Sequence, residues 1–409
     1  MRGIPFEREK HFKDCLLTWK DAWWHREGHE EAEAEFMEAG DALVGEQDGK
    51  AVALALSCGG SFHHRDHKEE LEICIISGIT TAFHGRKSGF AGTLTAELLA
   101  RSAEQGSALA GLSMFEQGFY NRLGFGNMPD RNETMLRPSD ILTAGKISSP
   151  PVRLGPDDWK EIHACRAERY KCHGSLTGHP LMTRLEMGRQ SFVLGFRNSQ
   201  GRLTHHVQIG KIIGENGPAF TGWMAFSTPE QFRELMLLIK SLGDQIDMIR
   251  ITELPGISLQ TILRKPILFA RETRKYPGRE NGARNHSWTQ CRILNLKKCI
   301  NGMTCPGPEV SFNLSLNDPV EKFLDDSFTW KGCTGEYTVN FSENSSVENG
   351  HTPGLECLSC SVGTFTRLWN GSSTASNLRY TDTVKGSSNL LKALDRCLLL
   401  PEPDYDWEL

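Results

Sequence analysis

The sequence has 409 residues, more than one ordinary hydrophobic core accommodates, so we expect two to four domains. Hydrophobic, charged and aromatic fractions of 38%, 24% and 9% are those of a soluble globular protein and exclude a low-complexity chain. The formal net charge of -5, without a cluster of Lys and Arg, argues against nucleic acid as a partner and favours a cationic substrate.

The first residues, MRGIPFEREKHFKDCLLTWKDAWW, carry charges every few positions. They contain no apolar stretch long enough for a signal peptide or a membrane span, so we expect a cytoplasmic protein without a membrane span. Its twelve cysteines are then expected to be free thiols in a reducing compartment. Cys357 and Cys360 have C-x-x-C spacing but no second pair to close a zinc site, which favours a strand and no metal.

The elements of the first segment alternate between strands and helices. ALVGEQDGKAVALALS predicts a hairpin that turns at Asp48-Gly49. The polar HHRDH (63–67) that follows has residue types that bind metals, but without an identified distant partner it is expected in a surface or substrate-entry loop. LEICIISGITTAF (71–83) predicts a buried strand. After a glycine-rich stretch, TLTAELLARSAEQG predicts a helix with Gly106 as its C-cap. Strand, glycine loop and helix together indicate an α/β unit.

Two further segments follow polar linkers. In the second, STPEQFRELMLLIKSLG predicts a helix that Thr228 caps, Pro229 begins and Gly243 ends, and MIRIT predicts a strand after it. No glycine-rich loop precedes this helix, so we interpret the second segment as a scaffold. In the third, EVSFNLSLN and EYTVNF alternate as half-buried strands do, and NLLKALDRCLLL predicts a short amphipathic helix.

The glycine-rich stretch GRKSGFAG (85–92) has neither P-loop nor dinucleotide-binding spacing. It contains R-x-x-G-x-A, from Arg86 to Ala91, between the predicted strand and helix. Glycine lets an anion approach the backbone, and the first helical turn offers unpaired N–H groups and the positive end of the helix dipole. With charge from Arg86 and Lys87, the stretch is predicted to bind a pyrophosphate.

About thirty residues later, GLSMFEQGFYNRLGFG contains F-Y-x-R-x-G-F. The two motifs together resemble those of the GNAT superfamily of acetyl-CoA-dependent N-acetyltransferases. The order of the three segments further resembles the Eis-like acetyltransferases. That resemblance implies an α/β (α+β) protein with a GNAT domain carrying the acetyl-CoA site (1–137), a degenerate GNAT-like domain (150–272) and a sterol-carrier-protein-like α+β domain (287–409).

The resemblance also implies roles for particular residues. Tyr120 takes the general acid position, and the α-carboxylate of Leu409 takes that of the general base. The chain differs from the family at Phe83, Ser88 and Leu409, where proline, a denser arginine run and phenylalanine are common. The implied acetyl-CoA contacts are Ile79, Thr80, Thr81, Arg86, Lys87, Ser88, Gly89, Phe90, Ala91, Gly92, Phe115 and Glu116.

We therefore expect acetyl transfer from acetyl-CoA, without a metal, to a primary amine that attacks directly in a ternary complex. The acceptor stays open between an aminoglycoside, a polyamine, a peptide lysine and other amines. The acidic stretch HREGHEEAEAEFMEAG (25–40) is interpreted either as a solvated helix face or as an attractor of a cationic amine. The resemblance implies homo-oligomers built on trimers, up to hexamers. The alternative function is a non-catalytic acyl-CoA or lipid binder that uses the C-terminal domain.

Overall fold

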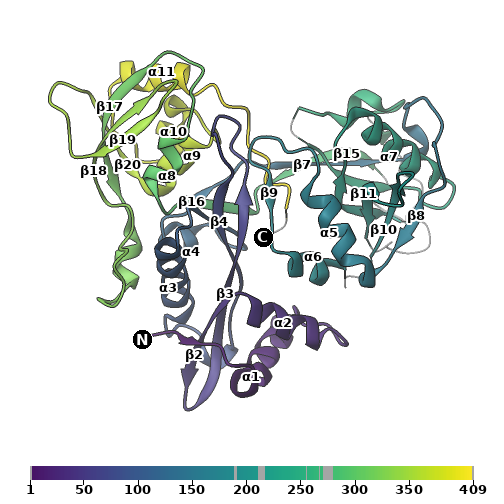
Figure 1. The fold of residues 1–409 in the computed structure, drawn as a ribbon, viewed down its shortest axis with the longest axis horizontal. Coiled ribbons are helices and arrows are strands. Elements are labelled where there is room, and N and C mark those ends of the chain that lie inside the picture. The colour runs from purple at the N-terminus through teal and green to yellow at the C-terminus, as the bar shows by residue number, and fades with distance from the viewer. Residues whose placement is uncertain are drawn as a thin grey trace. The chain divides into compact units, whose positions relative to one another are not determined.

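The computed structural model of the chain describes residues 2–187, 191–210, 217–254, 256–266, 268–269 and 280–407. By its internal packing the chain forms two compact units. The first consists of Met1–Pro129, Cys172–His179 and Trp288–Leu409, and the second of Asp130–Lys171 and Pro180–Ser287. These units group the chain by packing, and the division into three domains stays a prediction. Both units are mixed α/β structures, as predicted (Figure 1).

The first unit contains an eight-stranded mixed sheet in which only β4 and β5 pair in parallel. Glycine in the hairpin and β-branched and small residues in the strands fit this pleated, buried surface. β9 (Leu176–Thr177) pairs with β3 off the main path. The other strands run in the order β1 (Ile4–Pro5), β2 (Asp41–Gln47), β3 (Lys50–Phe62), β4 (Leu71–Thr81), β5 (Leu109–Ser113), β16 (Thr289–Ile293) and β6 (Gly126–Asn127).

One strand of this sheet comes from the far end of the chain. β16 lies between β5 and β6 and is antiparallel to both, with Cys291 opposite Gly111 and Gly126. Trp288 extends this pairing, because its carbonyl accepts a hydrogen bond from the Met114 N–H at 2.7 Å. The sheet of the N-terminal segment is therefore completed by the C-terminal segment.

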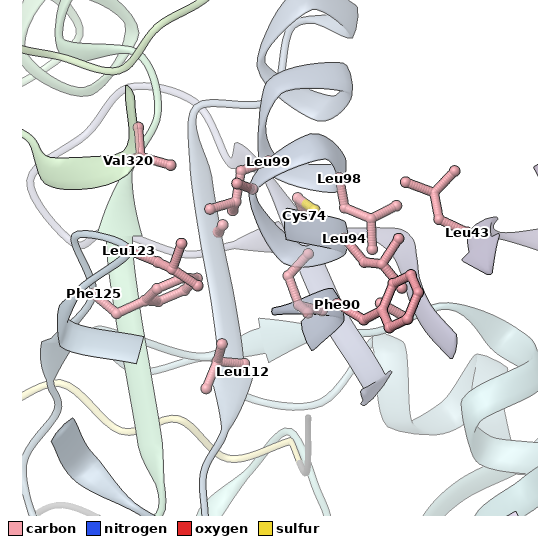
Figure 2. Close-up of a cluster of buried hydrophobic side chains, with 14 of the residues drawn as sticks. Leu43, Cys74, Phe90, Leu94, Leu98, Leu99, Leu112, Leu123, Phe125 and Val320 are labelled. Carbon is pink, nitrogen blue, oxygen red and sulfur yellow. The ribbon is translucent and has the colours of Figure 1, made fainter. Parts of the chain in front are cut away.

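Helices cover both faces of this sheet. α3 (Phe90–Gln105) packs on one face over a buried cluster that includes Leu94, Leu98 and Leu99 (Figure 2). Val320, which follows the C-terminal strand β17, belongs to the same cluster. α1 (Arg8–Asp21) covers the opposite face. Three further helices complete this part of the unit: α2 (Glu30–Ala39), α4 (Gln117–Asn121) and α8 (Leu296–Asn301).

The C-terminal segment adds a four-stranded sheet covered by helices. β17 and β20 pair in parallel, whereas β17, β18 and β19 form an antiparallel meander. Buried aromatic and leucine side chains fill the space between the sheet and its helices. The elements are β17 (Val310–Asn317), β18 (Gly335–Phe341), β19 (Ser346–Asn349), β20 (Cys357–Ser361), α9 (Val362–Trp369), α10 (Ala375–Thr381) and α11 (Ser388–Cys397).

The second unit also contains an eight-stranded sheet. α7 (Pro229–Ser241) packs on it through Leu235, Met236 and Ile239, and α5 (Trp159–Ala167) and α6 (Pro180–Met187) belong to the same unit. β12 and β13 form its parallel pair. The strand order is β14 (Leu268–Phe269), β15 (Glu280–His286), β7 (Arg131–Leu136), β13 (Ile249–Thr252), β12 (Ala219–Ala225), β11 (Leu203–Ile209), β10 (Phe192–Arg197) and β8 (Val152–Leu154).

Several predicted local features are confirmed. The hairpin turns at Asp48 and Gly49 with φ of 52° and 75°, and Gly106 is the left-handed C-cap of α3. CLSC lies in β20, and all twelve cysteines are free thiols. α7 ends at Ser241 with Leu242 as its C-cap, so the predicted stop at Gly243 was one residue late.

The HHRDH segment was wrongly predicted to be a surface loop throughout. His64 is 1% exposed, because its ring stacks on Trp369 and meets His173 edge to face at 4.6 Å. His67 contacts the carbonyl of Lys298. In the described parts of the chain, no three His, Cys, Asp or Glu residues are grouped as a metal site would require. None of the described helices is long and apolar enough to cross a bilayer.

His173 makes the stability of the first unit sensitive to acid. Its Nδ1 accepts from the Arg65 N–H at 3.2 Å and its Nε2 lies 2.8 Å from the Asn370 carbonyl, which fits the neutral ring. Burial lowers the pKa of His173 from 6.5 to about 4. The unfolded chain therefore takes up the proton first, and stability is lost as the pH falls from 6.5 towards 4, by up to about 3 kcal/mol.

We expect His173→Gln to be less stable than the native protein at pH 7 and to approach it at pH 4.5, because the variant no longer has this ring to protonate. Denaturant midpoints at both pH values measure the difference. The exposed His84 provides the matched control, His84→Gln. A gap between His173→Gln and native protein that is the same at both pH values would contradict the assignment.

Candidate active site

The candidate site begins where two parallel strands separate. β4 and β5 pair only from Ile73 opposite Leu109 to Ile75 opposite Gly111. Beyond these pairs β4 continues beside β3 to Thr81, whereas β5 continues beside β16 to Ser113. The facing main-chain edges of the two strands are then open to a ligand. Ile79, Thr80 and Thr81 lie on this separated part of β4.

A β-bulge changes the direction of β4 where this strand separates from β5. Thr80 pairs with Leu54 and Ser77 with Leu56, so Gly78 and Ile79 together stand opposite Ala55. Gly78 has φ of 62°, and a Cβ there would lie 2.8 Å from Leu56 and 2.9 Å from Trp19. Only glycine fits both the conformation and the space. The bulge turns the strand edge at Ile79, where the sequence predicted a coenzyme contact.

The predicted anion-binding loop follows β4 directly. A short 3₁₀ turn, Phe83–Gly85, leads into Arg86, Lys87 and Ser88, and all three of these side chains are exposed. Lys87 and Gly89 have φ of 66° and 86°, so the backbone makes two left-handed steps before α3. No ion pair joins Arg86 or Lys87 to another residue of the described chain. Their charges are available to an anion.

The start of α3 has no side-chain cap. Gly89 is the N-cap, and the first helical hydrogen bond runs from the Thr93 N–H to the Gly89 carbonyl at 3.2 Å. The N–H groups of Phe90, Ala91 and Gly92 have no acceptor among the described residues. A Cβ on Gly89 would meet nothing within 4 Å, so the space above the loop is open. Unpaired donors, a helix dipole and open space are the features that a phosphate group needs.

Phe90 fixes this loop to the sheet. Its ring is 5% exposed and occupies the position that a side chain at Gly45 of β2 would overlap. Phe90 therefore anchors the helix start, while the polar backbone of the same turn stays outward. The sequence predicted Phe90 as a coenzyme contact, and in this conformation only its main chain faces the open side of the loop.

Tyr120 lies on α4 and is partly buried. Tyr120, Phe119 and Ile79 all pack against the buried cluster that contains Phe90. The Tyr120 ring meets Phe119 edge to face at 4.9 Å and Phe125 at 6.1 Å. Burial raises the pKa of Tyr120 from 10 to about 12. Its hydroxyl has no hydrogen-bond partner among the described residues, so it can donate to a ligand.

Phe115 and Glu116 connect β5 to α4. The Glu116 carboxylate accepts from the Gly118 N–H at 3.1 Å and caps the helix. Phe115 is 84% exposed, and its ring lies 5.9 Å from that of Trp24, in the segment between α1 and α2. An aromatic pair therefore links the end of β5 to this segment.

The acidic stretch of α2 is not wholly solvated. Glu33 is 4% exposed, and its carboxylate lies 2.7 Å from His25 Nδ1 and accepts from the Arg26 N–H. These contacts hold the segment that carries Trp24. Glu31 and Glu38 instead pair with Arg8 on the surface. The interpretation as a solvated face is therefore wrong for Glu33.

The C-terminal tail is fixed as far as the structure describes it. Trp407 is 1% exposed, as expected of an apolar anchor, and the Asp406 carboxylate accepts from the Leu176 N–H at 3.0 Å. The Tyr405 hydroxyl pairs with the thiol of Cys291, which points to the sheet face opposite α3. Leu409, the predicted base, lies outside the described residues.

Two side chains of β16 also contribute to the site, and the sequence did not identify them. Gln290 and Arg292 alternate with Cys291 and pair with Leu112 and Ala110, so they point to the face covered by α3. Gln290 reaches α4, and Arg292 donates to the Leu123 carbonyl and pairs with Asp318. The available signal in the sequence was the alternation of Gln290 and Arg292 within TQCRIL, which does not show what these side chains contact.

The second unit repeats the strand separation but not the anion site. β12 pairs with β13 only at Ala219 and Phe220 and has a bulge at Gly222, whose open side is filled by Gln208. At the start of α7 the Thr228 hydroxyl accepts from the Gln231 N–H at 3.3 Å. Pro229 has no N–H to offer. This helix start is therefore satisfied internally.

The arrangement in the first unit can perform three chemical tasks. The loop at Gly89 can hold phosphate groups, and the open edge of β4 can donate an N–H to a developing oxyanion. Tyr120 can donate a proton. Its high pKa keeps it protonated, and a thiolate held among the same apolar side chains would also have a raised pKa, which favours transfer between them.

Comparison with known proteins supports this interpretation. Residues 6–128 match the acetyltransferase (GNAT) domain family. A search of curated proteins finds none that matches the chain.

Solved structures match the chain over its full length. They include a conserved protein of unknown function from Enterococcus faecalis V583, described as a probable N-acyltransferase, with a TM-score of 0.79 and 16% identity over 100% of this chain and 99% of that one. A GCN5-related N-acetyltransferase from Kribbella flavida has a TM-score of 0.75 and 15% sequence identity over 100% of both chains. Eis1 from Mycobacterium abscessus has a TM-score of 0.74 and 14% sequence identity over 100% of this chain and 99% of that one. The chain therefore has the Eis-like fold that its sequence predicted.

Proposed function

Because residues 6–128 match the GNAT acetyltransferase domain family and the whole chain has a fold similar to that of Eis1, we propose that the protein transfers acetyl from acetyl-CoA to a primary amine. The observation that carries this proposal is the uncapped start of α3 beside the separated strands β4 and β5. The pyrophosphate binds the N–H groups from Phe90 to Gly92, with Arg86 and Lys87 adding charge. The rest of the coenzyme enters between the strands, along Ile79–Thr81.

In this proposal the amine attacks the acetyl group directly. An N–H of the open β4 edge near Ile79 stabilises the oxyanion, and Tyr120 protonates the departing thiolate. The α-carboxylate of Leu409 accepts the proton of the amine through water. Aromatic side chains at Trp24 and Phe115 and the acidic α2 favour a cationic acceptor near the end of β5. A cytoplasmic location and a trimer-based assembly stay predictions.

The anion loop is tested by placing a negative charge in it. We expect Gly89→Glu to weaken acetyl-CoA binding by about tenfold or more, which corresponds to about 1.4 kcal/mol, because the carboxylate repels the pyrophosphate. Calorimetric titration with acetyl-CoA measures the affinity. Gly89→Gln is the matched control, since it has the same size and the same left-handed strain without the charge. Equal affinities of the two variants would exclude an anion at this loop.

The role of Tyr120 is tested by removing its hydroxyl. Tyr120→Phe is expected to lower kcat by about 10²–10⁴-fold while acetyl-CoA affinity stays near native, because only the proton donor is lost. With a raised pKa of about 12, Tyr120 keeps its proton at pH 10, so the native rate is not expected to fall between pH 8 and pH 10 through its ionisation. Steady-state rates across this range provide both measurements, and native kcat in Tyr120→Phe would reduce Tyr120 to a packing residue.

The base is tested by moving the terminal carboxylate. A three-glycine extension after Leu409 keeps every side chain but displaces the charge, and it is expected to lower kcat by about 10²-fold or more. Leu409→Phe is the control, because it changes the side chain and keeps the carboxylate in place. Thiol release under saturating acetyl-CoA gives the rates. An extended protein as fast as the native chain would show that another group accepts the proton.

A further inference from the structure

α4, which carries Tyr120, is too short to be stable by itself. It has five residues, one turn and a half, and isolated helices of this length do not persist in water. None of its residues is fully buried. Its position therefore depends on contacts from outside the helix, and any group that holds it also decides where the Tyr120 hydroxyl lies.

The side chain of Gln290 is the contact that holds α4 at both ends. Gln290 is fully buried, and its Nε2 lies 3.3 Å from the Gln117 carbonyl at the first residue of α4 and 3.2 Å from Asn121 Oδ1 at the last. The same nitrogen also lies within hydrogen-bond distance of Asn127 Oδ1, on β6. Because an amide NH₂ has only two N–H bonds, Gln290 shares them among these three acceptors, and its Oε1 has no hydrogen-bond partner among the described residues. One amide group thus contacts the start of the helix, its end and the strand that follows it.

Gln290 is itself held rigidly. It lies in the middle of β16, paired with Leu112 on one side and Asn127 on the other. Two residues further on, Arg292 donates to the Leu123 carbonyl, in the turn after α4, and pairs with buried Asp318. This turn is also hydrogen-bonded to the main chain of Tyr120, because the Leu123 N–H donates to the Tyr120 carbonyl at 2.8 Å. The side-chain amide of Gln290 is therefore held in a fixed position on β16, next to the short helix α4.

We propose that Gln290 is a positioning residue for acetyl transfer: through its bonds to Gln117 and Asn121, the C-terminal segment sets the place of the Tyr120 hydroxyl. This inference rests on the proposed role of Tyr120. It assigns the C-terminal segment a part in catalysis, since the strand that carries Gln290 lies 170 residues after Tyr120 in the sequence (290 minus 120). Gln290 does not touch the coenzyme loop at Gly89, so its effect falls on turnover and not on coenzyme affinity.

The decisive experiment is a double-mutant cycle of Gln290→Leu and Tyr120→Phe in the full chain. Gln290→Leu alone is expected to lower kcat by about 10²-fold, the cost of a misplacement of about 1 Å, with acetyl-CoA affinity near native. In the Tyr120→Phe background the same change is expected to cost little more, because a donor that is absent cannot be misplaced. If the kcat losses of the two single variants multiply in the double variant, the inference is overturned and Gln290 has only a general structural role.

The environment of Tyr120 gives a second measurement. Burial raises its pKa to about 12, and a loosened α4 admits water and returns the pKa towards about 10. Subtracting the ultraviolet titration of the Tyr120→Phe protein isolates the tyrosinate signal of Tyr120. We expect this signal below pH 11 in Gln290→Leu and not in the native protein. Its absence from both proteins would count against movement of Tyr120.

Controls separate positioning from folding. Thr366→Val removes another buried hydrogen bond of the same strand, from the Ile293 N–H at 3.0 Å, without touching α4, and its kcat is expected to stay near native. If Gln290→Leu does not fold, Asn121→Ser breaks the contact from the α4 side and must show the same non-additive loss. Native kcat in Tyr120→Phe alone would instead refute the proposed function of Tyr120, and the inference with it.

Discussion

The candidate site depends on the short pairing of β4 and β5. Parallel strands normally use every N–H and carbonyl along their length, but these two pair at only three positions before they separate. Each strand still pairs along its other edge after the two separate, because β4 continues beside β3 and β5 continues beside β16. The bulge at Gly78 turns the open edge of β4. The separated part of β4 is partly exposed at Ser77, Gly78, Ile79 and Thr81, so its main chain is accessible from outside the sheet.

The two units show how one backbone arrangement can be open or closed to a ligand. In the first unit, the helix that follows the separated strand begins at Gly89 with no cap. In the second, the Thr228 hydroxyl accepts from the Gln231 N–H and the Gln231 side chain accepts from the Ser227 N–H at the start of α7, and Gln208 fills the space beside Gly222. The start of α7 is therefore capped by side chains of the second unit itself, whereas the start of α3 is left uncapped.

The C-terminal segment is bound into the sheet of the first unit by a buried charge pair. Arg292 and Asp318 are both fully buried, and Asp318 also accepts from the Cys333 N–H at 2.8 Å. Such a pair is not by itself a source of stability, but losing one partner leaves a bare buried charge at a cost of about 3–5 kcal/mol. The pair therefore acts as a constraint on folding, because β16, the turn after α4 and the segment after β17 must all be packed together for both charges to be paired.

The sequence by itself determined the local elements and the anion loop, because short-range physics decides them. Asp48-Gly49 adopts the left-handed turn that the sequence predicted, and Gly89 precedes α3 in a left-handed conformation that glycine tolerates. The order of motifs further predicted the Eis-like fold. Only the tertiary structure decided which distant segments complete the site. Gln290 and Arg292 are two polar residues on one face of a short strand, and a strand pattern shows which side chains share a face but not which element they meet. Their partners on α4 exist because β16 pairs with β5, a long-range contact that no local pattern encodes.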